Sequence, residues 1–356
     1  MHGIYIHIPF CRSRCGYCSF VSYPSPDNQL IENYFNALKE EIHTRQKQSE
    51  SADSVYIGGG TPSLVDSDHI AEILSIVNNE YNIKNSAEIT IEMNPESVTS
   101  RKIQCYTDSG INRLSVGIQS INNNALKLLG RPHTREEAQA ALDIIESYSI
   151  NTSIDLLLGI KGHSFECSVL DSYPFINHVS AYMLTPESGS YFFDNNVDIE
   201  ADESGIISEY STLLSELRSR GYERYEVSNY ARANMYARHN TLYWDIHNTY
   251  TGYGPSACSY NRSRRRTNTG DITRYIKDPL ACTEETVSHS KRQFEAIMLG
   301  MRTTEGIDYN SYSDMLDMKQ VRDYEERGLI TLEDGRLRAT DRGFLLLNSI
   351  TVDIVR

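Results

Sequence analysis

Three cysteines lie within eight residues near the start of the chain, as Cys11, Cys15 and Cys18. Their spacing is C-x3-C-x2-C, whereas the remaining cysteines of the seven are scattered. Three thiolates are one fewer than a closed structural zinc site uses, and His7 is near enough in sequence to be weighed as a fourth zinc ligand. A [4Fe-4S] cluster fits the count better, because three cysteines hold three irons and one iron stays open. The spacing therefore favours an iron–sulfur cluster with an exchangeable position.

Alternating strands and helices must position this loop. Hydrophobic periodicity predicts strands over 4–8, 54–57, 87–93, 113–118, 154–158 and 179–184. It predicts helices over 27–45, 68–78, 98–108 and 135–148. Strands separated by helices imply a parallel sheet, which right-handed crossovers curl into a barrel or part of one. Functional side chains should then gather at the carboxyl ends of the strands. Those ends carry Cys11, Gly58 to Gly60, Glu92, Gln119 and Asp155.

The second half of the chain has a different pattern. The alternation weakens after about residue 190, and Tyr, Asn and Arg become frequent. Residues 286–356 combine helical segments with two short strands around Asp334-Gly335, a strong hairpin signal. Helices followed by such a hairpin resemble a winged helix, but the acidity of this region favours a packing role. We therefore predict an α/β protein with a barrel over 1–190, an extension over 191–285 and a smaller α+β, winged-helix-like domain over 286–356.

Composition excludes several classes of function. Asp and Glu number 48 against 34 Lys and Arg, a net charge of −14, which disfavours a nucleic-acid partner. No apolar run is long enough for a membrane span. The first residues have no basic segment or cleavage site of a signal peptide, so we expect a cytoplasmic protein.

The cysteine spacing after a first strand resembles the radical S-adenosylmethionine (SAM) enzymes. Further motifs are similar to the oxygen-independent coproporphyrinogen III oxidase branch of that superfamily, and they run in order through most of the chain. They are Tyr5-Ile6-His7-Ile8-Pro9-Phe10-Cys11, Gly58-Gly59-Gly60-Thr61-Pro62, Glu92-Met93-Asn94-Pro95, Arg113-Leu114-Ser115-Val116-Gly117-Ile118-Gln119 and Ile154-Asp155-Leu156. The resemblance implies a partial (β/α)6-type radical SAM barrel. It also implies a [4Fe-4S] cluster whose open iron is chelated by SAM, an electron donor, and cleavage of SAM to a 5′-deoxyadenosyl radical.

The same resemblance implies roles for individual residues. Gly59 and Gly60 match glycines whose backbone meets the methionine amino group. Glu92 and Arg131 match a pair around the methionine end, and an Arg suits a carboxylate because its fork is bidentate. The remaining matches are Gln119 and Asp155 to groups that bind the ribose hydroxyls, Tyr5 to a residue near the cofactor, and Tyr17 to the aromatic residue before the third cysteine.

Two readings of function remain. The motif H-N-x-x-Y-W, at His239, Tyr243 and Trp244, resembles the heme chaperone family HemW, which implies a protein that binds heme and delivers it to an unidentified acceptor protein. An imidazole is a common heme ligand, and aromatic rings offer flat faces to a macrocycle. The alternative is an oxygen-independent coproporphyrinogen III dehydrogenase, a radical SAM decarboxylase of heme biosynthesis.

Two features favour the chaperone. The dehydrogenases continue their cysteine motif to a fourth cysteine, where this chain has Phe20, and they carry a longer arm before the cluster. We therefore expect no coproporphyrinogen dehydrogenase activity. One position departs from the chaperone pattern: Cys258 stands where the family more commonly has His, which puts a ligand role there in doubt, although a thiolate can bind heme iron.

Overall fold

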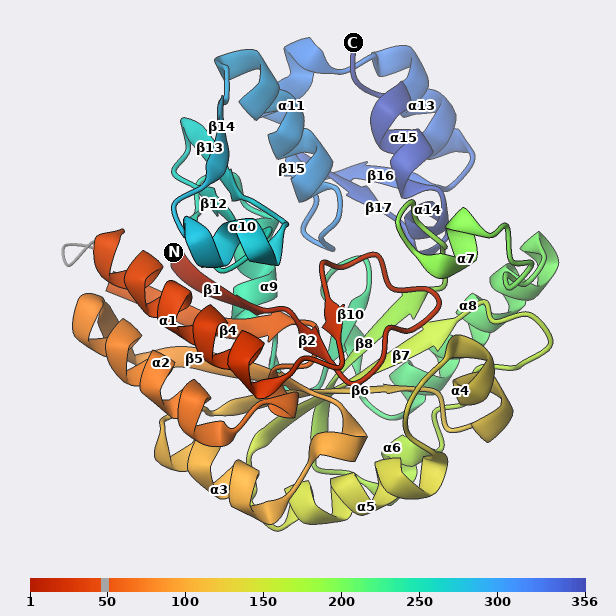
Figure 1. Cartoon of the computed structure of the whole chain (residues 1–356). Coiled ribbons are helices and arrows are strands. Elements are labelled where there is room, and N and C mark those ends of the chain that lie inside the picture. Colours follow the sequence, from red (N-terminus) through yellow and green to blue (C-terminus); the bar gives the residue numbers. More distant parts are fainter. Residues whose placement is uncertain (46–50) are drawn as a thin grey trace.

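The computed structural model describes residues 1–45 and 51–356, and strands and helices alternate through its first half (Figure 1). All six predicted strands are present, although β5 begins earlier than predicted. They are β1 (His2–Ile8), β4 (Ser51–Gly59), β5 (Asn82–Met93), β6 (Arg113–Gln119), β7 (Asn151–Leu158) and β8 (Ile176–Met183). Neighbours in the order β1-β4-β5-β6-β7-β8 pair in parallel, as the alternation predicts.

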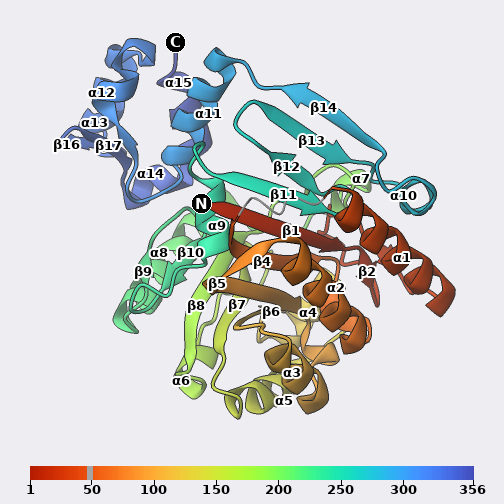
Figure 2. The same ribbon diagram turned by 90° about the vertical axis from the view of Figure 1, so that its left-hand side faces the viewer.

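The predicted helices are also present and cover the outer face of this sheet (Figures 1 and 2). They are α1 (Asn28–Thr44), α2 (Ser67–Glu80), α3 (Ser100–Asp108) and α5 (Arg135–Glu146). Their starts follow from local chemistry: the Asp27 side chain accepts a hydrogen bond from Leu30 N at 2.7 Å, and Thr134 and Glu137 form a capping box.

Strand β1 has one hydrophobic face and one polar face. Ile4, Ile6 and Ile8 are fully buried among the core side chains. Tyr5 and His7 alternate with them and therefore point to the opposite, interior face of the sheet. The hydrophobic face holds the helices, which leaves polar side chains to line the barrel interior.

The region after residue 190 continues the same sheet at both edges. On one side β10 (Asn229–Ala231) and β9 (Glu223–Arg224) pair antiparallel next to β8. On the other side β11 (Thr249–Tyr253) lies parallel to β1, with His2 opposite Thr249. The antiparallel strands β12 (Cys258–Tyr260), β13 (Arg264–Asn268) and β14 (Cys282–Thr286) then complete a 12-stranded sheet.

The remaining helices between residues 123 and 277 are mostly short. They are α4 (Asn123–Leu129), α6 (Val169–Ser172), α7 (Tyr191–Asp194), α8 (Glu203–Ser219), α9 (Arg238–Tyr243) and α10 (Ile272–Lys277).

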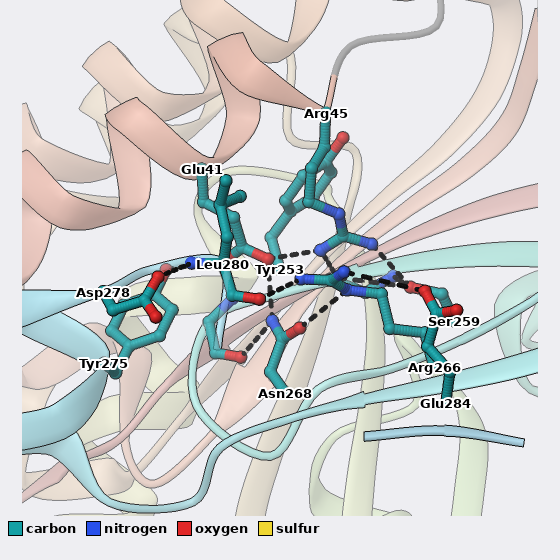
Figure 3. A network of polar contacts seen from close by, with 12 residues as sticks. Glu41, Arg45, Tyr253, Ser259, Arg266, Asn268, Tyr275, Asp278, Leu280 and Glu284 are labelled. Carbon is teal, nitrogen blue, oxygen red and sulfur yellow. Dashed lines mark hydrogen bonds and ion pairs between the residues drawn. The ribbon is translucent and has the colours of Figure 1, made fainter. Parts of the chain in front are cut away.

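A buried carboxylate fastens this extension to α1 (Figure 3). Glu41 is fully buried, and it accepts hydrogen bonds from Gly254 N at 2.9 Å, from Asn268 Nδ2 at 2.7 Å and from the Tyr275 hydroxyl at 2.7 Å. It also pairs with the guanidinium of Arg45, which in turn donates to Gly252 O at 2.9 Å. A buried charge is tolerated when it is paired and hydrogen-bonded, and this one joins α1, β11, β13 and α10.

The C-terminal region lies to one side of the barrel (Figure 2). Its sheet has the order β15 (Ile307–Asp308), β17 (Arg336–Ala339), β16 (Ile330–Glu333). Asp334 and Gly335 both have positive φ, 51° and 72°, as a tight hairpin turn requires, so the predicted hairpin is confirmed. The helices of this region are α11 (His289–Gly300), α12 (Tyr309–Tyr312), α13 (Met318–Glu326), α14 (Asp341–Leu345) and α15 (Leu347–Asp353). In the described parts of the chain, no helix is both long and apolar enough to cross a membrane.

Candidate cofactor site at the barrel rim

The three clustered cysteines lie on one wall of a cavity of about 350 Å³ at the carboxyl ends of the strands. Cys11 ends β2 (Phe10–Cys11), which pairs with β3 (Tyr23–Pro24) on the far side of the loop. Two backbone hydrogen bonds hold the cysteine loop in place. Gly16 N donates to Leu129 O at 3.0 Å, and Cys18 N donates to Cys15 O at 3.2 Å.

Hydrogen-bond donors and the backbone of a glycine lie next to the sulfur atoms. Thr61 Oγ1 lies 3.7 Å from Cys11 Sγ, and Arg131 Nη1 lies 3.6 Å from Cys15 Sγ. A Cβ on Gly60 would come within 2.9 Å of Cys11 Sγ and 2.7 Å of Phe10 O, so only glycine fits there. Burial raises the pKa of the Cys11 thiol to about 11, so an isolated thiol would stay protonated. A donor set of three sulfurs with a neighbouring cation suits an anionic iron–sulfur cluster.

The zinc alternative finds no support in the position of His7. Its Nε2 hydrogen-bonds Val21 O at 2.8 Å, and its Nδ1 hydrogen-bonds the Tyr5 hydroxyl at 2.9 Å. Burial lowers the pKa of His7 to about 4, so its imidazole is neutral, but both ring nitrogens are in use. Among residues 1–45 and 51–356, no three His, Cys, Asp or Glu side chains are grouped to hold a single metal ion.

Glu92 faces the cavity from the end of β5. Its carboxylate accepts hydrogen bonds from Gly59 N at 3.0 Å and the Tyr56 hydroxyl at 2.8 Å. A Cβ on Gly58 would approach this carboxylate to 3.0 Å, and Gly59 has a φ of +119°, so the glycine run is required by geometry. Burial, together with the charge of Asp155, raises the pKa of Glu92 to about 7 despite the two hydrogen bonds. Both hydrogen-bond donors to Glu92 are uncharged, so a cationic ligand beside it would supply the missing positive charge.

Arg131 reaches the cavity from the loop after α4. Gly130, with a φ of 73°, ends that helix, and Arg131 Nη2 donates to Asn94 Oδ1 at 2.8 Å and Gly117 O at 2.7 Å. Its Nε is buried without a hydrogen-bond partner in the described chain. The guanidinium is thus held in place next to Cys15, at the edge of the cavity.

Gln119 and Asp155 lie on neighbouring strands, β6 and β7, and both line the cavity. Gln119 has a φ of 65°, rare for a side chain other than glycine, at a shift in the strand register. Asp155 Oδ1 accepts a hydrogen bond from Ser115 Oγ at 3.3 Å, and burial raises its pKa. The pair supplies an amide and a carboxylate, which are groups suited to hydroxyl ligands.

Two other predicted residues occupy different places. Tyr17 lines the cavity, and burial raises its pKa. Tyr5 is not among the lining residues: its ring stacks on Tyr56, with 6.2 Å between the ring centroids. The sequence placed Asn94 in a motif but gave no role to it, and in the structure it orients Arg131. The sequence analysis missed Tyr182, which lines the cavity and is 40% exposed. Tyr182 occupies the end of β8, and its position at a strand terminus was the available signal.

The three residues of the H-N-x-x-Y-W motif are not brought together on one surface. His239 is 1% exposed, and its ring nitrogens lie 2.8 Å from Ser54 Oγ and 2.9 Å from the Tyr243 hydroxyl. Burial, followed by the charge of Arg113, lowers the pKa of His239 to about 3. As folded, this imidazole has no free nitrogen, so binding a heme iron would require both hydrogen bonds to break. Trp244 and Tyr243 line two different cavities. Cys258 lies on β12, half-buried, with Thr267 Oγ1 at 3.7 Å from its sulfur.

Two family models and several curated proteins match this chain. Residues 5–169 match the Radical SAM superfamily, and residues 287–346 match the HemN C-terminal domain. The chain is 34% identical to the protein named heme chaperone HemW of Buchnera aphidicola subsp. Schizaphis graminum, over 78% of this chain and 73% of that protein. It is 28% identical to the heme chaperone HemW of Bacillus subtilis over 98% of both chains.

The fold has a solved counterpart. Coproporphyrinogen III oxidase (HemN) from Escherichia coli superimposes with a TM-score of 0.86 over 99% of this chain and 89% of that one. At 19% identity this similarity establishes the fold and leaves the reaction open.

Proposed function

The chain belongs to the heme chaperone HemW family within the radical SAM superfamily, and we propose that it binds heme and delivers it to an acceptor protein. In this proposal the barrel cavity carries a [4Fe-4S] cluster and SAM. One observation carries it: a three-cysteine loop faces a cavity lined by Glu92, Arg131 and Asp155 in a chain whose similar relatives are named heme chaperones.

The residues around the cavity suit the two cofactors. Cys11, Cys15 and Cys18 would hold the cluster, and Thr61 and Arg131 would donate to its sulfurs. When bound, the cluster and SAM supply one-electron chemistry, for which a separate electron donor is needed. The chain itself binds and orients SAM.

The orienting groups divide by charge. Glu92, with Gly59 and Gly60 beside it, would meet the methionine ammonium, and the Arg131 guanidinium would meet the methionine carboxylate. Gln119 and Asp155 would bind the ribose hydroxyls, with Tyr17 beside the cluster and Tyr5 packed against Tyr56, whose hydroxyl donates to Glu92.

The cofactor part is tested by anaerobic reconstitution. We expect one [4Fe-4S] cluster per chain by iron and sulfide analysis, and its loss in Cys11→Ala, Cys15→Ala or Cys18→Ala. Cys105→Ala, which changes a cysteine outside the loop, serves as the matched control. The electron paramagnetic resonance spectrum of the reduced cluster should change when SAM is added. Stoichiometric zinc without sulfide would contradict the assignment.

The heme part is tested against the oxidase alternative, whose fold this chain shares. Purified protein should bind about one heme per chain and should leave coproporphyrinogen III unconverted under anaerobic, reducing conditions. Multiple-turnover conversion to protoporphyrinogen IX would instead assign the dehydrogenase activity. Phe20 is 66% exposed beside the cluster loop, in the position where the dehydrogenases have a fourth cysteine.

A further inference from the structure

A second large cavity, of about 570 Å³, lies between α9 and the C-terminal region. We refer to it as the α9–α11 cavity. Its barrel-side wall includes Tyr236, Trp244 and His247, and its other wall includes Ile307, Tyr312 and Arg336. Figures 1 and 2 both show α9 between the barrel strands and α11. A volume of this size is typical of sites for small molecules and cofactors.

The aromatic walls suit a flat ligand. The ring of Tyr236 stacks on Tyr225 at 4.3 Å between centroids, which fixes its orientation. Trp244 is the one residue of the His239, Tyr243 and Trp244 set that lines this cavity. Burying apolar ring surface against aromatic side chains favours a macrocycle over a small polar ligand.

His247 supplies an imidazole to the same cavity. Its backbone is held on both sides, because His247 N donates to Asp245 Oδ1 at 2.9 Å and Arg262 Nε donates to His247 O at 2.7 Å. The side chain is exposed, and within the described residues neither ring nitrogen has a hydrogen-bond partner. By contrast, both ring nitrogens of the motif histidine, His239, are already hydrogen-bonded. The free imidazole on a fixed backbone is therefore the better iron ligand.

Arg336 gives the α9–α11 cavity a positive charge that can pair with a carboxylate of the ligand. Arg336 donates through Nε to Glu305 O and through Nη2 to Gly306 O, both at 2.9 Å, so its side chain is anchored. Within the described residues no hydrogen bond engages its Nη1, which leaves that nitrogen to pair with a carboxylate. Three acids, Asp245, Glu305 and Asp308, also line the cavity, and Asp308 accepts a hydrogen bond from Ser311 N at 3.1 Å.

We propose that heme binds in the α9–α11 cavity with the His247 imidazole as an axial ligand of the iron and a propionate near Arg336. This rests on the proposed function, since it names the site at which a heme-binding chain holds its cargo. It also moves the axial ligand from the motif histidine to a residue outside the motif.

The experiment is a hemin titration of the full-length chain with its cluster reconstituted. His247→Ala should weaken binding at least tenfold and abolish the imidazole-type Soret spectrum, and added imidazole should restore that spectrum. His247→Met should bind heme with a different ligand spectrum, an effect that a merely structural residue would not produce. His289→Ala, which changes another exposed histidine, is the matched control and should behave as the wild type.

The results separate this inference from the proposed function. If the wild type binds heme and His247→Ala binds it with the same affinity and spectrum, the inference is overturned while the chaperone function stands. If the wild type binds no heme in either redox state, both are overturned. His239→Ala, with intact iron–sulfur absorbance and far-ultraviolet circular dichroism as checks on folding, should retain the imidazole-type spectrum, and its selective loss there would return the ligand role to His239.

Discussion

Glu41 is a fully buried carboxylate and Glu92 is a partly buried one, and their partners differ in number and kind. Glu41 has a guanidinium, a phenol, an amide and a backbone N–H around it (Figure 3). Glu92 has one phenol and one backbone N–H, and it faces a cavity. The charge of Glu41 is balanced by the Arg45 guanidinium within the protein. Glu92 has no such cationic partner among the described residues, and its pKa is raised to about 7.

The difference distinguishes a carboxylate that stabilises the fold from one that is available for binding. A buried charge whose partners are complete holds together the elements that supply them. A buried charge with too few partners costs free energy in the empty protein, and a cationic ligand regains that energy on binding. The same contrast applies to His239, whose two ring nitrogens are hydrogen-bonded, and His247, whose ring nitrogens have no hydrogen-bond partner among the described residues.

The largest expected effect is on stability. Glu41→Ala should lower the free energy of unfolding by about 3–5 kcal/mol, because Arg45 is left without its carboxylate and Tyr275 and Asn268 lose their acceptor. Urea denaturation followed by circular dichroism measures it. Glu40→Ala, at the exposed neighbouring position, should change the free energy by about 0.5 kcal/mol or less. A loss below about 1 kcal/mol for Glu41→Ala would mean that the two carboxylates do not differ as described.

The next effect is on cofactor affinity. Glu92→Gln should weaken SAM binding by roughly 10- to 100-fold, since a charged hydrogen bond to the methionine ammonium is worth about 1.5–3 kcal/mol. The free energy of unfolding should stay the same or rise, because an under-neutralised charge has been removed. Isothermal titration calorimetry and urea denaturation give the two quantities. Glu187→Gln, on the exposed side of the cysteine loop, is the control. A strongly destabilised Glu92→Gln with normal affinity would reverse the comparison.

A smaller effect should follow from pH. The pKa of Glu92 is raised from 4.5 to about 7, so the folded protein holds this proton more tightly than the unfolded chain does. Its ionisation therefore removes stability as pH rises from about 4.5 to 7, and it creates the anion that attracts the ammonium. The affinity for SAM should rise about tenfold between pH 6 and pH 8. Calorimetry across this range should show a flatter profile in Glu92→Gln, and identical profiles would exclude Glu92 as the titrating group.

The smallest effect concerns one donor of the Glu41 network. Tyr275→Phe removes one hydrogen bond while Arg45, Asn268 and Gly254 remain, so stability should fall by about 1 kcal/mol. Tyr191→Phe, at a 63% exposed position, is the control and should have no measurable effect. Equal denaturation midpoints for the two variants would show that the phenol contributes nothing to the network.

The sequence by itself determined the features that depend on local order. Alternating isoleucines identified β1, and Asp334-Gly335 identified the hairpin. The cysteine spacing and the glycine run placed the rim cavity, because parallel strands bring their carboxyl ends to one edge whatever the details of packing.

Tertiary structure decided which side chains are available. The sequence offered His239 as a heme ligand, but Ser54 and Tyr243 occupy its ring nitrogens, and Ser54 is 185 residues away. It gave no sign that β11 would pair with β1 or that Glu41 would meet Asn268 from 227 residues away. Availability, burial and pKa depend on partners that come from distant parts of the chain. Local periodicity and spacing carry no information about those partners, so only the packed structure reveals which acid is neutralised and which imidazole is free.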